Sequence, residues 1–161
     1  MRTLFVIISI IFCIDTTAQT NDLSKMNQAQ KKEYLVKTAA KVTKTFGPDY
    51  YRENMKSKST ITEGFFESAD ERSEVKKNVG RKFYIVTFPY DKSKETLDFD
   101  FSSSVKIWEN TGEPLEVIFG NGQGKNFIFL SYKKQINSRS IIETVPYEQA
   151  KLHEGKFIEN Q

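Results

Sequence analysis

Residues 97–108 read LDFDFSSSVKIW, and this stretch decides the fold class. Its odd positions carry apolar side chains apart from Ser103. Its even positions carry polar side chains up to Lys106, and the last even position is Trp108. Because side chains alternate between the two faces of a β-strand, the pattern predicts a strand with one face on a core and one in water. The segment is long for a strand, so we expect a β-bulge near residues 102–104.

Further strands are expected on both sides of this segment. Residues 83–88 are apolar on both faces, as in a central strand, and Pro89 ends them. Other strands are expected at 115–119, 127–132 and 141–145, with turns at 110–114 and 120–124. A brief strand is expected at 60–62, and residues 146–148 are expected to open a short terminal helix.

Two helices are expected before the strands. Leu35, Ala39, Val42 and Phe46 fall on one face of a helix placed at about residues 26–46. Gly47 and Pro48 end this helix, and its opposite side carries a solvated row of lysines, Lys37, Lys41 and Lys44. A second, mostly polar helix is expected at about 69–78, after a capping box that runs from Ser68 to Glu71.

The order of these elements, helices first and then an antiparallel meander, predicts an α+β fold. We expect the N-terminal helix to pack on an antiparallel β-meander of four to five strands, with the odd face of 97–108 against it. The domain is expected to cover residues 19–161.

The start of the chain predicts a secretory signal peptide over residues 1–18. Arg2 precedes an apolar run from Leu4 to Ile14, and small residues lead to a cleavage site after Ala18. The run is too short for a permanent membrane span. We therefore expect a secreted or periplasmic protein. An alternative is a lipoprotein acylated on Cys13, although Phe12 stands where such signals have a small residue.

Composition excludes several function classes. The formal net charge of +3 in a chain that is 28% charged argues against nucleic acid as a partner. Cys13 is the only cysteine, so the mature domain has neither a disulfide nor a thiolate metal ligand. His153 is the only histidine, which excludes a multi-histidine metal site. We expect no cofactor and no bound metal.

The run from Gly120 to Lys125 is glycine-rich but departs from known phosphate-binding loops. Phe119 stands where a Walker loop needs glycine, and Asn126 stands where it needs Ser or Thr. We therefore interpret the run as a hairpin loop, in which Asn121 and Lys125 are candidate binding residues.

Three further residues are candidates for binding. Asp98 and Asp100 share one face of the expected strand, either as an acid–base pair or as a solvated surface. Trp108 belongs to the wet face, where an exposed indole would stack on a sugar or anchor a protein partner, unless a bulge turns it inward. Asp91, Ser93 and Glu95 lack the length and glycine of a calcium loop.

The stretch from Val105 to Val117, VKIWENTGEPLEV, preceded by FYIVTF at 83–88 and a short helix, resembles PepSY-type secreted domains over about residues 68–119. The resemblance implies a periplasmic binding or inhibitory module with no catalytic residues.

Two hypotheses about function follow from these patterns. The first is a non-enzymatic module that binds an envelope protein or glycan through its sheet face or hairpin loops. The second is a small secreted hydrolase or ligand-pocket enzyme that uses Asp98 or Asp100.

Overall fold

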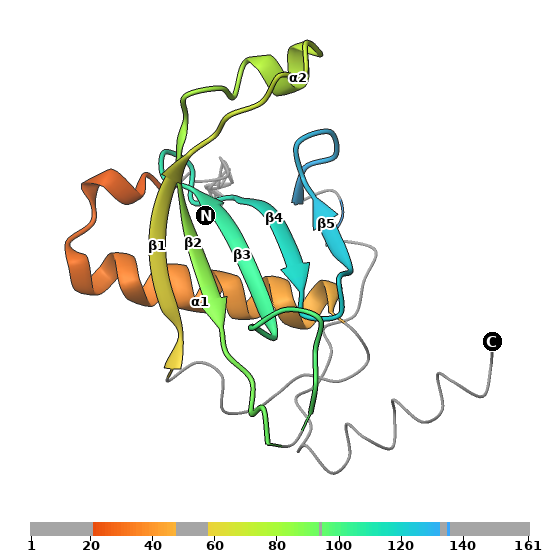
Figure 1. Cartoon of the computed structure of the whole chain (residues 1–161). Coiled ribbons are helices and arrows are strands. Elements are labelled where there is room, and N and C mark those ends of the chain that lie inside the picture. Colours follow the sequence, from red (N-terminus) through yellow and green to blue (C-terminus); the bar gives the residue numbers. More distant parts are fainter. Residues whose placement is uncertain (1–20, 48–57, 94, 133–134, 136–161) are drawn as a thin grey trace, which may run out of the picture.

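The computed structural model describes residues 21–47, 58–93, 95–132 and 135. One long helix lies across one face of a five-stranded antiparallel sheet with the strand order β1-β2-β3-β4-β5 (Figure 1). The elements are η1 (Leu23–Lys25), α1 (Gln28–Phe46), β1 (Thr60–Phe65), α2 (Ser73–Lys76), β2 (Lys82–Phe88), β3 (Ser103–Trp108), β4 (Pro114–Phe119) and β5 (Gly124–Asn126). The expected α+β meander with an N-terminal helix is confirmed.

Several expected features lie outside the described residues. They are the signal peptide at 1–18, the strand at 141–145, the helix that opens at 146–148, and His153. Within the described ranges, no helix is both long and apolar enough to cross a membrane.

Helix α1 begins and ends where local chemistry dictates. The Asn27 side chain accepts a hydrogen bond from the Gln30 amide (2.9 Å), and the Gln30 side chain accepts one from the Asn27 amide (3.3 Å). This reciprocal cap satisfies two amides that the first turn leaves unpaired, so the helix begins at Gln28 rather than at residue 26. At the other end, the Gly47 amide donates to the carbonyl of Thr43.

The core lies between α1 and one face of the sheet. The expected helix stripe, Leu35, Ala39, Val42 and Phe46, is buried there, whereas Lys37 and Lys41 are exposed. The sheet contributes Tyr84, Val86, Phe88, Val105, Ile107, Val117 and Phe119. Removing each large apolar side chain of this set from water contributes about 1.5–3 kcal/mol.

The long strand expected at 97–108 is only half formed. β3 begins at Ser103, and the expected alternation holds from there to Ile107. Before it, the chain bends, and Phe99 is 43% exposed and stacks on Phe101 instead of entering the core. The cause lies in β2, the neighbouring strand, which ends at Phe88 because Pro89 offers no amide for the ladder.

The bulge is also displaced from its expected position at 102–104. The register of β3 against β4 shifts between Lys106 and Ile107, so that Glu116 and Pro114 are their partners and Leu115 is the extra residue. Leu115 therefore turns to the face of the sheet opposite α1, where it packs with Trp108.

The ends of the sheet differ from the expected strands. β1 is longer than the expected 60–62, whereas the strand expected at 127–132 is wrong. The Phe119 amide donates to the Gln123 carbonyl (2.8 Å), which closes the hairpin early and pairs residues 124–126 with β4. Phe127 then leaves the sheet and packs its ring against Phe46 (5.2 Å between centroids).

The expected helix at 69–78 shrinks to the single turn α2, and its capping box is absent. The Ser68 hydroxyl accepts from the Asp70 amide (3.1 Å), and the Asp70 carboxylate accepts from the Arg72 amide (3.0 Å). Such local bonds hold the backbone in turns and compete with a helix, which explains the late start at Ser73.

Candidate functional site

Trp108 is buried, with 7% of its surface exposed, so of the two alternatives left open by the sequence the structure favours a packed indole over an exposed one. It does lie on the face of the sheet away from α1, but the segment of residues 66–81, here called the arm, folds over it. The rings of Phe66 and Phe83 pack edge-on at 5.6 and 6.3 Å, and the Arg81 guanidinium lies 4.0 Å from the indole centroid. Trp108 is therefore a core residue of a second, smaller cluster.

The aspartates do not form an acid–base pair. Asp98 and Asp100 are both exposed on the bent segment before β3 rather than on a strand face. The Lys92 ammonium donates a hydrogen bond to Asp100 (2.6 Å) and lowers the pKa of that carboxyl. A general acid needs a raised pKa, so this environment does not favour acid catalysis by Asp100.

The glycine-rich hairpin uses its polar groups internally. The Asn121 side chain accepts from the Gln123 amide (3.2 Å), and the Gly120 amide donates to the carbonyl of Ser102 (2.9 Å). Lys125 is exposed on the edge strand β5. Amides that are already bonded do not form an anion cradle, which agrees with the interpretation as a hairpin loop.

The acidic residues near Asp91 do not form a metal site either. The Asp91 carboxylate accepts from the amide and the hydroxyl of Ser93 (3.0 and 2.6 Å), as in a local turn. Across the described part of the chain, no group of three metal-ligating side chains comes together.

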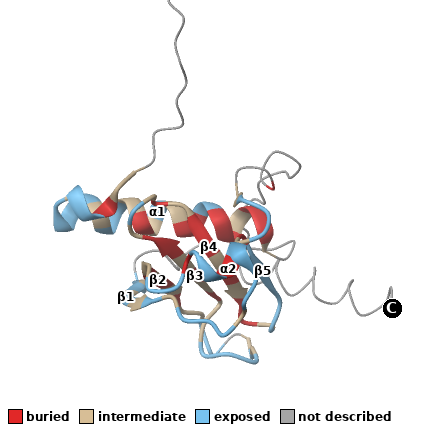
Figure 2. Cartoon of the chain, turned by 90° about the horizontal axis from the view of Figure 1, so that it is seen from above, coloured by how far each residue is buried: buried red, intermediate tan, exposed pale blue. Residues whose placement is uncertain are grey.

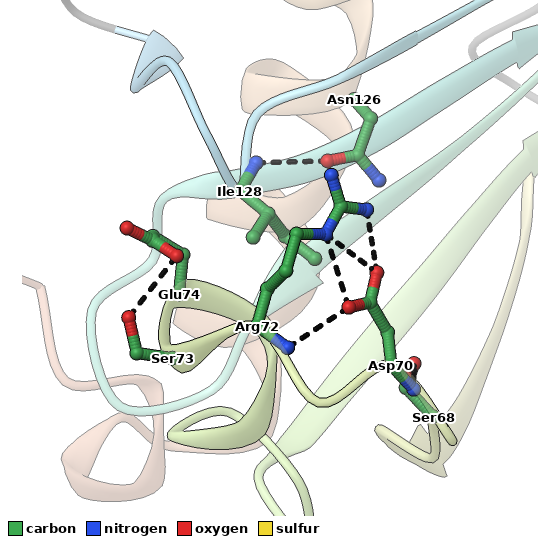
Figure 3. Close-up of polar contacts among 7 residues, drawn as sticks. All are labelled: Ser68, Asp70, Arg72, Ser73, Glu74, Asn126 and Ile128. Carbon is green, nitrogen blue, oxygen red and sulfur yellow. Dashed lines mark hydrogen bonds and ion pairs between the residues drawn. The ribbon is translucent and has the colours of Figure 1, made fainter.

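The polar residues drawn in Figure 3 lie where the arm contacts the segment that follows β5. Arg72 makes a bidentate ion pair with Asp70, in which Nε lies 3.0 and 2.9 Å from the two carboxylate oxygens and Nη2 lies 2.5 Å from Oδ2. These hydrogen bonds lower the pKa of the Asp70 carboxyl to about 2. The same guanidinium lies 4.3 Å from the ring centroid of Phe129 and points toward Asn126 and Ile128. Because its charge is already paired, we interpret the cluster as a structural contact between the arm and the segment after β5.

A groove of about 440 Å³ lies on the α1 side of the sheet, between α1 and the edge strand β1. The side chains that define it are Lys31, Lys32 and Leu35 of α1, Ile61 and Glu63 of β1, and Tyr84 of β2. We call it the α1–β1 groove. It lies where the sheet ends, and Figure 2 shows β1 there with mostly exposed and half-buried residues.

Beside this groove, the outer edge of β1 has no strand partner among the described residues. The Phe66 amide donates to the Arg81 carbonyl (2.8 Å), in line with the β1–β2 register. Bonding alternates along an antiparallel pair, so the backbone of the even residues of β1 faces β2. Ile61, Glu63 and Phe65 therefore direct their N–H and C=O groups outward, where no strand of the described residues pairs with them.

Charges at one end of the groove form a chain of contacts. Lys31 donates to the hydroxyl of Tyr84 (3.2 Å), which in turn donates to Glu109 (2.8 Å). Lys82 lies 2.9 Å from Glu63 and 3.5 Å from Glu109. The hydrogen bond that Lys82 donates to the Glu63 carboxylate raises the pKa of Lys82. The carboxylates of Glu63 and Glu109 therefore both interact with Lys82.

None of the candidate residues found from sequence lines the α1–β1 groove. Tyr84 and Lys31 are 53 positions apart, and nothing in the local pattern of either predicts their contact. The one available signal was the brief strand expected at 60–62, whose polar neighbours are typical of an edge strand.

Comparison with known proteins identifies no relative: no family model, no curated protein and no solved structure matches this chain. The inference about function therefore depends on the geometry of its own surfaces.

Proposed function

We propose that the protein is a non-enzymatic binding module that takes an extended segment of a partner protein along β1. The observation that carries the proposal is the outward-facing backbone of Ile61, Glu63 and Phe65 beside the α1–β1 groove. A strand added there would complete the backbone hydrogen bonds of the edge, and its alternate side chains would enter the groove.

The edge of β1 has the features that favour such pairing. Natural proteins protect edge strands with proline, bulges or inward-pointing charges. β1 contains no proline, and its register against β2 is regular along its whole length. Its charged side chain, Glu63, is paired with Lys82 rather than placed to repel an incoming strand.

We propose further that binding occurs outside the cytoplasm, as the signal peptide at residues 1–18 implies. The resemblance of residues 68–119 to PepSY-type domains supports the same class of binding module. A partner in the cell envelope that offers an extended protein segment fits both, and a glycan partner, which cannot bond to a strand edge in this way, fits less well.

Replacing Glu63 by proline tests the proposal. Because the Glu63 amide points outward, proline removes a donor from the open edge without removing a β1–β2 bond. For a peptide selected from a random library on the purified mature chain, we expect affinity to fall by about tenfold or more. Fluorescence anisotropy measures the change.

Glu63→Ala is the matched control, since it removes the same side chain but keeps the amide. We expect it to retain most of the affinity for the selected peptide. Equal binding by both variants and the parent chain would contradict strand addition, and so would a library that gives no binding peptide.

A further inference from the structure

The α1–β1 groove has two chemically different ends. Leu35 and Ile61 form an apolar end, because Ile61 packs against the buried Leu35 cluster. Lys31 and Tyr84 form a polar end, with Lys32 beside them. Along β1, Ile61 lies at the apolar end, and Glu63, the cross-strand partner of Tyr84, lies at the polar end.

An added strand would run along β1, with two groove-facing side chains beside Ile61 and Glu63. Alternate residues of a strand lie about 7 Å apart on the same face, so one side chain reaches the apolar end and its i+2 neighbour reaches the polar end. Each end therefore selects one side chain of the bound segment.

The polar end carries a net positive charge, because Lys31, Lys32 and Lys82 outnumber the carboxylates of Glu63 and Glu109 by one. Lys31 donates to the hydroxyl of Tyr84 rather than to a carboxylate. In the part of the chain that the structure describes, neither Lys31 nor Lys32 forms an ion pair, and the nearby Glu63 and Glu109 are both within reach of Lys82. The groove thus offers two ammonium groups to an incoming anion.

We infer that the bound segment carries a carboxylate side chain, Asp or Glu, two residues from an aliphatic one. This inference rests on the proposed function, since it names the chemistry of the segment that pairs with β1. The carboxylate accepts hydrogen bonds from Lys31 and Lys32 at the mouth of the groove, and the aliphatic side chain covers Ile61.

The test compares a selected peptide with its carboxylate-to-amide analogue on the full mature chain. We expect the amide analogue, and equally the double variant Lys31→Gln with Lys32→Gln, to bind about tenfold more weakly, a difference of about 1.4 kcal/mol. The loss should diminish as ionic strength rises, because the lysines are close to solvent.

The matched control is the double variant Lys37→Gln with Lys41→Gln, which removes the same charge from the exposed side of α1. We expect it to bind the acidic peptide almost as the parent does. An equal loss of affinity in both double variants would mean that only the net charge of the protein matters, and it would overturn the inference.

Failure of this inference differs from failure of the proposed function. If acidic and amide peptides bind equally and both lose affinity in Glu63→Pro, strand addition stands and the acidic preference is wrong. If the chain instead dimerises in sedimentation experiments, Glu63→Pro abolishes the dimer, and no peptide binds, the occupant is a second copy and both proposals fall.

Discussion

Replacing Trp108 by alanine should lower the free energy of unfolding by about 3–5 kcal/mol, the range for deleting a large aromatic side chain from a core. The indole fills the space between Phe66, Phe83 and the Arg81 guanidinium on the side of the sheet away from α1. Its loss leaves a cavity under the arm and removes the ring on which Arg81 stacks. Urea denaturation followed by far-ultraviolet circular dichroism measures the change.

Trp108→Phe serves as the control, because it keeps an aromatic ring and should lose much less stability. Trp108 is the only tryptophan, so its fluorescence reports this site alone. We expect emission typical of a buried indole in the native chain, shifting to longer wavelength on unfolding. Native emission typical of a hydrated indole, with an alanine variant as stable as the parent, would contradict the burial of Trp108.

Replacing Gly120 by alanine should cost about 2–3 kcal/mol of stability, toward the upper end for overpacking a close contact. A Cβ atom at this position would lie 2.3 Å from the carbonyl oxygen of Phe101 and 2.5 Å from Cδ1 of Leu97. The Gly120 carbonyl and amide also bond to Phe99 (3.1 Å) and Ser102 (2.9 Å), so the segment before β3 must move for the new atom to fit. Thermal and urea unfolding give the magnitude.

Gly80→Ala is the comparison variant. Gly80 has φ of +80° but no atom within 4 Å of a new Cβ, so the substitution introduces backbone strain alone, which costs about 1–2 kcal/mol. Gly120→Ala should therefore be the more harmful of the two. A Gly120 variant with full stability would mean that residues 97–102 do not pack on the hairpin.

The fold class was predictable because its signals are periodic. The α1 stripe, the two-sided β2 and the odd face from Ser103 to Ile107 each bury the side chains that their spacing predicts. The prediction of a strand over residues 97–102 was wrong, because alternation reports only a side-chain pattern and a strand also needs a neighbouring strand to pair with. That partner ends at Phe88, before Pro89.

The candidate site was not predictable in the same way. Trp108 was placed on the correct face of its strand, but the burial of that face depends on the arm, whose residues carry no apolar periodicity. The contact between Lys31 and Tyr84 joins a helix to a strand 53 positions away, and only the folded topology brings them together. Asp98 and Asp100 were expected on one strand face, either as an acid–base pair or as a solvated surface, and they lie exposed before β3 because the strand did not form there.

Amide hydrogen exchange along β1, resolved by NMR, tests the central claim most directly. In the free chain, the amides of Ile61, Glu63 and Phe65 should exchange rapidly, while those of Thr62 and Gly64 should be protected by β2. Adding a bound peptide should slow the three outward amides and leave the two inward ones almost unchanged. Strong protection of the outward amides in the free chain, or no change when the peptide binds, would contradict strand addition at β1.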